Sequence, residues 1–148
     1  MDESKQFFFK VFGVRQMFFQ CLHAKATNEQ VHPGQGPILG YLLHNGGGSQ
    51  ADIVRLMHVS AATVAVSVAR LEKLGFVTRE RNQANQRANV LLLTEKGRNA
   101  AVQMEQAMEE MGRAALNGFS AEDCKAMEGY CERIIQNLQN RYKQRSEA

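Results

Sequence analysis

Residues 49–80 read SQADIVRLMHVSAATVAVSVARLEKLGFVTRE. The first four, 49–52, have the form of a capping box with Asp in place of Glu, which marks the start of a helix. We expect this helix to span about eight residues and to be followed by a tight turn at residues 58–59. Ser60 is suited to cap a second helix, which closes at Gly75. A short helix, a brief turn and a longer helix make a helix-turn-helix pattern.

The hydrophobic period changes after this second helix. Residues 76–81 and 89–93 are rich in Val, Leu, Phe and Thr and predict two strands. Residues 82–88 between them are polar and predict a turn. A hairpin directly after a helix-turn-helix is a wing. The sequence therefore predicts a mainly α-helical protein with a small β-hairpin wing, in which residues 37–94 form a winged helix-turn-helix lobe.

Helical patterns flank this lobe on both sides. Residues 4–25 predict a helix with two apolar faces, and residues 95–145 predict two long helices with heptad-like seams. One lobe of this size is too small to cover so much apolar surface, and symmetric homodimers are the commonest solution. We therefore predict that residues 1–148 form a single domain and that 4–25 and 95–145 are helices of a homodimer interface.

The charge is uneven along the chain. The net charge of the 148 residues is +3. Residues 49–100 carry eight basic and four acidic side chains, whereas residues 101–148 carry six basic and eight acidic ones. This asymmetry suggests an anionic partner for the middle segment, with a merely solvated charged surface as the alternative.

Cysteine usage and targeting signals indicate a cytoplasmic protein. The three cysteines, Cys21, Cys124 and Cys131, are far apart and form no disulfide framework. The N-terminus is acidic where a signal peptide would be basic. The apolar stretch at residues 7–22 is interrupted by charged and amide side chains, so we expect no membrane segment.

Several blocks resemble MarR-type transcriptional regulators. Residues 60–64, SAATV, and 70–79, RLEKLGFVTR, look like that family's recognition helix and first wing strand. Residues 85–89, NQRAN, and 93–98, LTEKGR, are similar to its wing tip and the start of its fifth helix. The order of elements matches along nearly the whole chain. The resemblance implies a homodimer with interlocking first and last helices and two lobes on pseudo-palindromic double-stranded DNA, most often as a repressor released by a ligand.

The wing is the basic element of the predicted DNA surface. It carries Arg79, Arg81 and Arg87, and phosphate contacts by such side chains supply most of the affinity for DNA. By resemblance, Arg87 stands where the family's wing arginine reaches the minor groove or its phosphates; the alternative is a solvated hairpin charge. The family usually has Asp where this chain has Asn85, and an amide would orient the arginine less strongly. We therefore expect a more mobile wing.

The predicted recognition helix departs further from the family. Ala61, Ala65 and Val66 stand where many relatives have Arg or Thr, and bidentate readout of guanine needs Arg or Lys. We hypothesise readout of A·T-rich shape and thymine methyl groups; the alternative is that these three side chains pack against protein. The full set of candidate DNA-binding residues is Ser49, Gln50, Ser60, Ala61, Ala62, Thr63, Ala65, Val66, Arg70, Lys73, Arg79, Arg81, Asn85 and Arg87.

The sequence offers candidate residues for an effector site and for a redox site, but no specific motif for either. The resemblance implies a small aromatic or phenolic effector, for which Phe12, Phe19, His23, Tyr41 and His44 are candidates, with core packing as the alternative for each. Cys124 falls in the first turn of the last predicted helix, where the dipole favours a thiolate, and is the candidate redox residue. Cys21 and Cys131 lie on apolar stripes, which predicts burial.

Other chemistries find no support in the sequence. All four histidines precede residue 59 and no ligand-type spacing occurs, so we predict neither a metal site nor a cofactor. No phosphate loop, nucleophile–base order or paired carboxylates suggest an enzyme. Two functions stay open: a DNA-binding regulator, and a ligand-binding or interaction protein on the same fold with lost or weak operator recognition.

Overall fold

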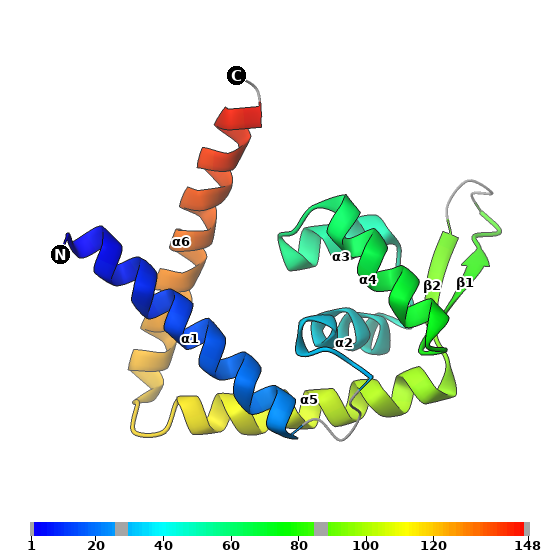
Figure 1. The fold of residues 1–148 in the computed structure, drawn as a ribbon, viewed down its shortest axis with the longest axis horizontal. Coiled ribbons are helices and arrows are strands. Elements are labelled where there is room, and N and C mark those ends of the chain that lie inside the picture. The colour runs from blue at the N-terminus through cyan, green and yellow to red at the C-terminus, as the bar shows by residue number, and fades with distance from the viewer. Residues whose placement is uncertain (1, 26–29, 85–88, 147–148) are drawn as a thin grey trace. The chain divides into compact units, whose positions relative to one another are not determined.

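The computed structural model describes residues 2–25, 30–84 and 89–146 (Figure 1). The chain divides into two compact units, Met1–Met111 and Gly112–Ala148. Each unit is described by itself below. In chain order the elements are α1 (Glu3–Lys25), the short 3₁₀ helix η1 (Pro33–Gln35), α2 (Gly36–Asn45), α3 (Gln50–Met57), α4 (Ala61–Lys73), β1 (Val77–Arg81), β2 (Asn89–Leu93), α5 (Glu95–Ala115) and α6 (Ala121–Ser146).

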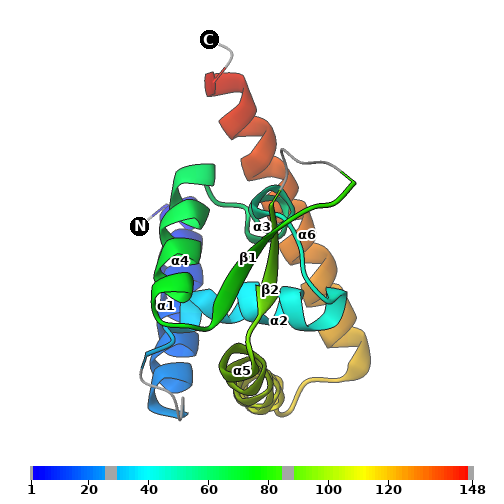
Figure 2. The ribbon, with the colours of Figure 1, turned by 90° about the vertical axis from the view of Figure 1, so that its right-hand side faces the viewer.

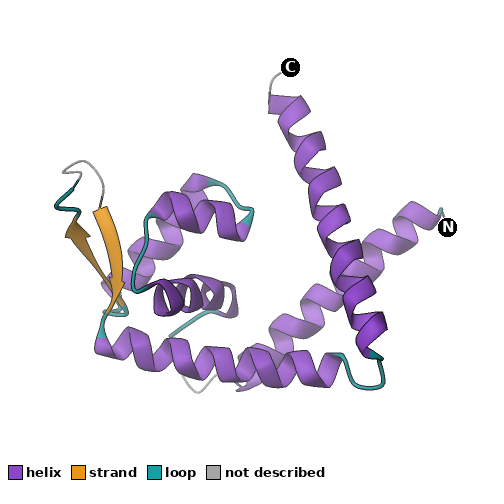
Figure 3. Cartoon of the chain, turned by 180° about the vertical axis from the view of Figure 1, so that it is seen from behind, coloured by secondary structure: helices purple, strands orange, loops and turns teal. Residues whose placement is uncertain are grey.

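The mainly α-helical class with one β-hairpin is confirmed (Figure 3). The helix-turn-helix forms as its caps predict: Ser49 is the N-cap of α3, and Ser60 is the N-cap of α4. His58 takes a left-handed conformation with φ of 54°, which turns the chain sharply between the two helices. Gly75 follows the end of α4 with φ of 80°, a conformation that glycine adopts without strain.

The two strands lie side by side next to α4 (Figure 2). They are antiparallel, with Val77 opposite Leu93 and Arg81 opposite Asn89. Gly48, in the segment between α2 and α3, adds a single bridge to Leu91, with N–O distances of 3.1 and 2.8 Å. The glycine run that ends α2 therefore also ties the start of the helix-turn-helix to the hairpin, a contact that the local sequence pattern does not predict.

The core of the first unit lies where α2, α3, α4, the hairpin and the first half of α5 meet. Each of these elements contributes at least one buried apolar side chain, and the burial of these side chains supplies the main driving force for folding. The buried members are Val31, Ile38, Leu39, Leu42, Ile53, Val64, Val68, Leu71, Phe76, Val77, Leu91, Ala100, Ala101 and Met104.

The joint between α4 and α5 explains the 93–98 block. Thr94 Oγ1 donates to the Gly75 carbonyl at 2.6 Å and accepts from the Gly97 amide at 3.0 Å, so it caps α5. Lys96 Nζ donates to the Leu74 carbonyl at 2.7 Å, where α4 ends. Its ammonium also lies 4.4 Å from the centroid of the Phe76 ring. The block thus starts one helix and closes another.

Helix α1 exposes most of its apolar side chains within this chain. Leu22 alone of its described side chains is buried. The large apolar side chains that α1 leaves exposed are Phe7, Phe8, Phe9, Val11, Phe12, Val14, Met17 and Phe18. The core of this chain therefore leaves most of the two predicted apolar faces of α1 uncovered.

The second unit contains α6. Ser120 and Asp123 cap its start reciprocally, since the Ser120 amide donates to Asp123 Oδ2 and the Asp123 amide donates to Ser120 Oγ, each at 3.0 Å. These hydrogen bonds lower the pKa of the Asp123 carboxyl. The described side chains of α6, up to Lys143, are all exposed or half-buried, including Tyr130 and Leu138 on its apolar stripe.

Candidate nucleic-acid interface

Helix α4 starts with a fully formed cap. The Ser60 hydroxyl accepts from the Thr63 amide at 3.1 Å, and the two side-chain oxygens lie 2.9 Å apart. Both residues are exposed. Each hydroxyl therefore lies at the surface of the helix end that precedes the predicted base-reading turns.

The outward face of α4 is made of small apolar groups. Ala61, Ala62, Ala65 and Val66 are all exposed, and 72% of Val66 is accessible to solvent. The helix buries the opposite face, which carries Val64, Val68 and Leu71. The alternative that Ala61, Ala65 and Val66 pack against the rest of the chain is thereby excluded for the described residues.

Exposed basic side chains occur at the end of α4 and at the end of β1. Arg70 and Lys73 lie in the last turn of α4, and Arg81 lies at the end of β1; all three are exposed. Exposed arginine and lysine side chains of this kind are what phosphate contacts require. Asn85 and Arg87, the predicted wing-tip residues, lie outside the described residues.

Arg79 differs from the other basic residues because two side chains hold it. Its Nε donates to Glu72 Oε1 at 2.9 Å and its Nη2 to Glu72 Oε2 at 3.3 Å. Its Nη1 donates to Gln50 Oε1 at 2.8 Å. The hydrogen bonds to Glu72 raise the pKa of the Arg79 guanidinium. Glu72 is not among the candidate site residues that the sequence predicts. The one sequence feature that points to it is its negative charge, which lies before Gly75 while the positive charge of Arg79 lies after it.

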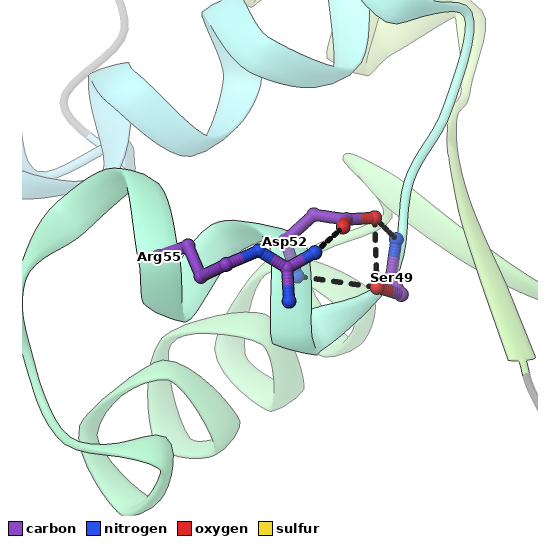
Figure 4. Close-up of polar contacts among 3 residues, drawn as sticks. All are labelled: Ser49, Asp52 and Arg55. Atoms are coloured by element: carbon purple, nitrogen blue, oxygen red, sulfur yellow. Dashed lines mark hydrogen bonds and ion pairs between the residues drawn. The ribbon is translucent and has the colours of Figure 1, made fainter.

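Ser49 and Gln50 stand at the start of α3, as predicted, and Ser49 is occupied by the capping box (Figure 4). Its hydroxyl donates to Asp52 Oδ2 at 2.7 Å and accepts from the Asp52 amide at 3.1 Å, while the Ser49 amide donates to the same carboxylate oxygen at 3.0 Å. Arg55 pairs with the other oxygen of Asp52. The bonds from Ser49, with a smaller effect of Arg55, lower the pKa of the Asp52 carboxyl.

The five predicted effector residues lie in different surroundings. Phe12 is exposed and stacks on Phe8, with ring centroids 6.5 Å apart. Phe19 is half-buried, 5.8 Å from the His32 ring and 4.6 Å from the Arg15 guanidinium. His23 is exposed at the end of α1.

The other two effector candidates belong to α2. Tyr41 packs against the core, and its ring lies within 2.5 Å of where a Cβ on Gly48 would stand. His44 is exposed, and its Nε2 faces a carboxylate oxygen of Glu105. Core packing therefore accounts for Tyr41 but not for His44.

The cysteines do not follow the predicted burial. Cys124 lies in the first turn of α6, as expected, and is half-buried. Cys21 is also half-buried, while Cys131 is exposed. The prediction that Cys131 is buried is wrong, because the stripe of α6 that carries it stays accessible along its described length.

The described residues also show whether side chains gather to bind a metal ion and whether a helix could span a membrane. Among residues 2–25, 30–84 and 89–146, no group of three or more His, Cys, Asp or Glu side chains is placed to hold a metal ion. In the same ranges no single helix has the length and apolar content to cross a membrane; only α3 and α4 taken together, bent by 118° at their junction, meet those two criteria.

Comparisons with known proteins agree with this geometry. Residues 29–88 match the sequence profile of the MarR family. The chain is 26% identical over 106 residues to YybA, an uncharacterised helix-turn-helix transcriptional regulator of Bacillus subtilis, covering 72% of this chain and 71% of the relative.

Two solved structures share the fold. One is assigned to the MarR family of transcriptional regulators, comes from Listeria monocytogenes and is complexed with a 26mer DNA; it is 19% identical with a TM-score of 0.80, covering 90% of this chain and 89% of that one. The other is the PcaV transcriptional regulator of Streptomyces coelicolor with its natural ligand, 18% identical with a TM-score of 0.80, covering 92% of this chain and 96% of that one.

Proposed function

We propose that this chain, a MarR-family DNA-binding transcriptional regulator, acts in the cytoplasm as a homodimeric repressor on a pseudo-palindromic operator. The observation that carries the proposal is the outward face of α4. It is capped and exposed, Arg70 and Lys73 are exposed in the last turn of the same helix, and Arg81 is exposed at the end of β1. A helix-turn-helix with such a face places its second helix in the major groove, and the basic residues meet the flanking phosphates.

The operator is A·T-rich in this proposal. The base-reading turns of α4 offer Ala61, Ala65 and Val66, which can contact thymine methyl groups but cannot donate hydrogen bonds to guanine. Thr63 and Ser60 add short hydroxyl groups near the start of the helix. Specificity then arises from methyl contacts and from the shape of A·T-rich DNA.

A second copy of the chain is the proposed partner of α1. Its exposed aromatic side chains, among them Phe8 and Phe12, form an apolar surface of the kind that monomeric proteins avoid. Helix α6 adds exposed Tyr130 and Leu138. A symmetric dimer would cover the surface of each copy and would place two α4 helices about one turn of DNA apart.

A small aromatic or phenolic ligand is the proposed effector. PcaV, which has the same fold, was solved with its natural ligand. In this chain the aromatic and imidazole groups of Phe12, Phe19, His23 and His44 are accessible enough to meet such a ligand, whereas Tyr41 serves the core as well. Release of the operator on ligand binding requires that the ligand bind the DNA-free form more tightly.

Fluorescence anisotropy tests the proposal. The purified protein is titrated onto DNA from its own upstream region and onto an unrelated duplex, at about 50 and 200 mM salt. We expect tighter binding to its own DNA and a log–log salt dependence of about −0.9 per phosphate neutralised. Lys73→Ala should reduce the slope, and Lys125→Ala, an exposed lysine of α6, should not.

The second candidate function is ligand binding or protein interaction with lost operator recognition. It is favoured by the lack of any arginine or lysine between Ala61 and Ala69 of the recognition helix. Equal and weak binding to both duplexes in the anisotropy experiment would move the assignment to this candidate.

A further inference from the structure

Three side chains from three elements of the DNA-binding lobe meet at Arg79. Gln50 is the first residue of α3, Glu72 lies in the last turn of α4, and Arg79 lies in the middle of β1. Gln50 and Glu72 precede Arg79 by 29 and seven residues in the chain. The hydrogen bonds that Arg79 donates to them are 2.8 to 3.3 Å long. The recognition helix, the helix before it and the wing strand are thus joined through one guanidinium.

The geometry uses the planar fork of arginine. Nε and Nη2 face the two oxygens of Glu72, while Nη1 faces Gln50. Such a two-pronged pair is stronger and more directional than a single contact, and a lysine ammonium cannot reproduce it. The side chains of Arg79 and Glu72 are 34% and 29% exposed, so water competes only in part.

The charges of this group nearly cancel. The Glu72 carboxylate balances the Arg79 guanidinium, so the group as a whole attracts phosphate weakly compared with Arg70, Lys73 or Arg81. The Gln50 amide is also oriented, because its oxygen accepts from Arg79. Its amino group, on the other branch of the amide, is the end that remains to face a DNA acceptor.

We propose that Glu72 is a positioning residue for DNA recognition: by clamping Arg79, and through it the amide of Gln50, it fixes α3, α4 and the wing strand relative to one another. Arg79 then serves as the centre of this clamp and not as the phosphate contact that its position in the basic wing suggests. The inference rests on the proposed DNA-binding function.

Four variants distinguish the positioning role of the Glu72–Arg79 clamp from the effect of net charge on DNA binding. Glu72→Gln removes the clamp and raises the net charge by one, and Glu80→Gln, on the exposed strand beside it, raises the charge equally and leaves the clamp in place. Arg79→Lys keeps the charge and loses the fork, and Arg133→Lys makes the same change at an exposed arginine of α6, outside the proposed DNA surface. Affinity for the protein's own upstream DNA and for an unrelated duplex is measured at several salt concentrations.

We expect Glu72→Gln and Arg79→Lys each to lower the ratio of specific to unrelated binding by about tenfold, the scale of a lost charged hydrogen bond. The salt slope of Arg79→Lys should stay at the parent value, and both control variants should keep the parent ratio. The proposal is overturned if Arg79→Lys keeps the ratio, or if Glu72→Gln behaves like Glu80→Gln and strengthens binding to both duplexes alike.

A measurement without DNA distinguishes failure of the clamp from failure of the proposed function. In ¹⁵N NMR spectra of the free protein, the Nε–H signal of Arg79 should exchange slowly with water, as a bonded donor does. It should remain in Glu80→Gln and be lost in Glu72→Gln. Rapid exchange in the parent protein would overturn the clamp even if the DNA binds. If the signal is protected but the parent protein does not prefer its own DNA, the operator function fails and the positioning role fails with it.

Discussion

At the scale of single residues, Gly97 shows how closely α5 approaches the loop after α4. A Cβ at this position would stand 1.8 Å from the Phe76 carbonyl oxygen, which is backbone and has no room to yield. We expect Gly97→Ala to lower the free energy of unfolding by about 1–3 kcal/mol, the scale of core overpacking. Urea denaturation followed by circular dichroism measures this change.

Gly112 provides the matched control on the same helix. Nothing lies within 4 Å of a Cβ built at Gly112. Alanine favours helix over glycine by roughly 0.5–1 kcal/mol, so Gly112→Ala should stabilise the protein. Equal effects of the two substitutions would contradict the close approach at Gly97.

Asp52 carries a pH dependence that follows from its pKa. Its bonds from Ser49 lower the pKa of the folded carboxyl below the unfolded value of about 3.9. The stabilisation is therefore complete above the unfolded pKa and is lost as the pH falls through the lower folded pKa. We expect Asp52→Asn to cost about 1 kcal/mol at pH 7 and progressively less below about pH 4.

Urea denaturation of the parent protein and Asp52→Asn at pH 7 and at about pH 3 measures the gap between their unfolding free energies. A gap of constant size at both pH values would show that the charge of the Asp52 carboxylate does not stabilise the capping box that it forms with Ser49.

At the scale of elements, Lys96 connects the end of α4 to the start of α5. Its ammonium donates to the Leu74 carbonyl at 2.7 Å, where α4 leaves its last carbonyls without helical partners. We expect Lys96→Met to lower the free energy of unfolding by about 1–2 kcal/mol, while Lys125→Met on α6 should change it by under about 0.5 kcal/mol. Thermal denaturation of both variants is the measurement, and equal melting temperatures would contradict the role of Lys96.

The elements also show what local sequence can and cannot predict. Helix starts at Ser49 and Ser60 were predictable because a cap and its helix are adjacent in the chain. The hairpin followed from the change of period. The bridge from Gly48 to Leu91 and the clamp on Arg79 were not predictable, because each depends on how separate elements pack.

The candidate site also has features that the sequence predicts and features that only the structure shows. The sequence places Ser60, Thr63, Ala65 and Val66 on the recognition helix, and their exposure in the structure agrees with a role at the surface. It also groups Arg79 with the other wing arginines as a phosphate contact. Only the three-dimensional arrangement shows that Arg79 is already engaged, since charge patterns along a chain do not reveal side-chain partners.

At the scale of the whole molecule, the exposed aromatic face of α1 predicts a dimer that charge can disrupt. Phe8 and Phe12 stack on each other and are 63% and 50% exposed in the single chain. A dimer should have twice the 16.6 kDa mass of the chain. Phe8→Glu together with Phe12→Glu should shift it towards the monomer mass, because burying unpaired charge costs several kcal/mol.

Light scattering after size exclusion measures these masses. Val66→Glu, which places the same charge on the exposed face of α4, should leave the mass of the dimer unchanged. A parent protein that elutes with the mass of one chain would contradict the homodimer.

The division of α4 into a buried and an exposed face has a consequence for how a protein with the proposed function diversifies. Val64, Val68 and Leu71 maintain the fold, whereas Ala61, Ala65 and Val66 contribute little to it. Because surface substitutions rarely change stability by more than about 0.5 kcal/mol, a duplicated gene could exchange these outward side chains and acquire a new target sequence without first compensating for a weakened core. The residues that preserve the fold and the residues that would determine the recognised DNA sequence are thereby separate within one helix.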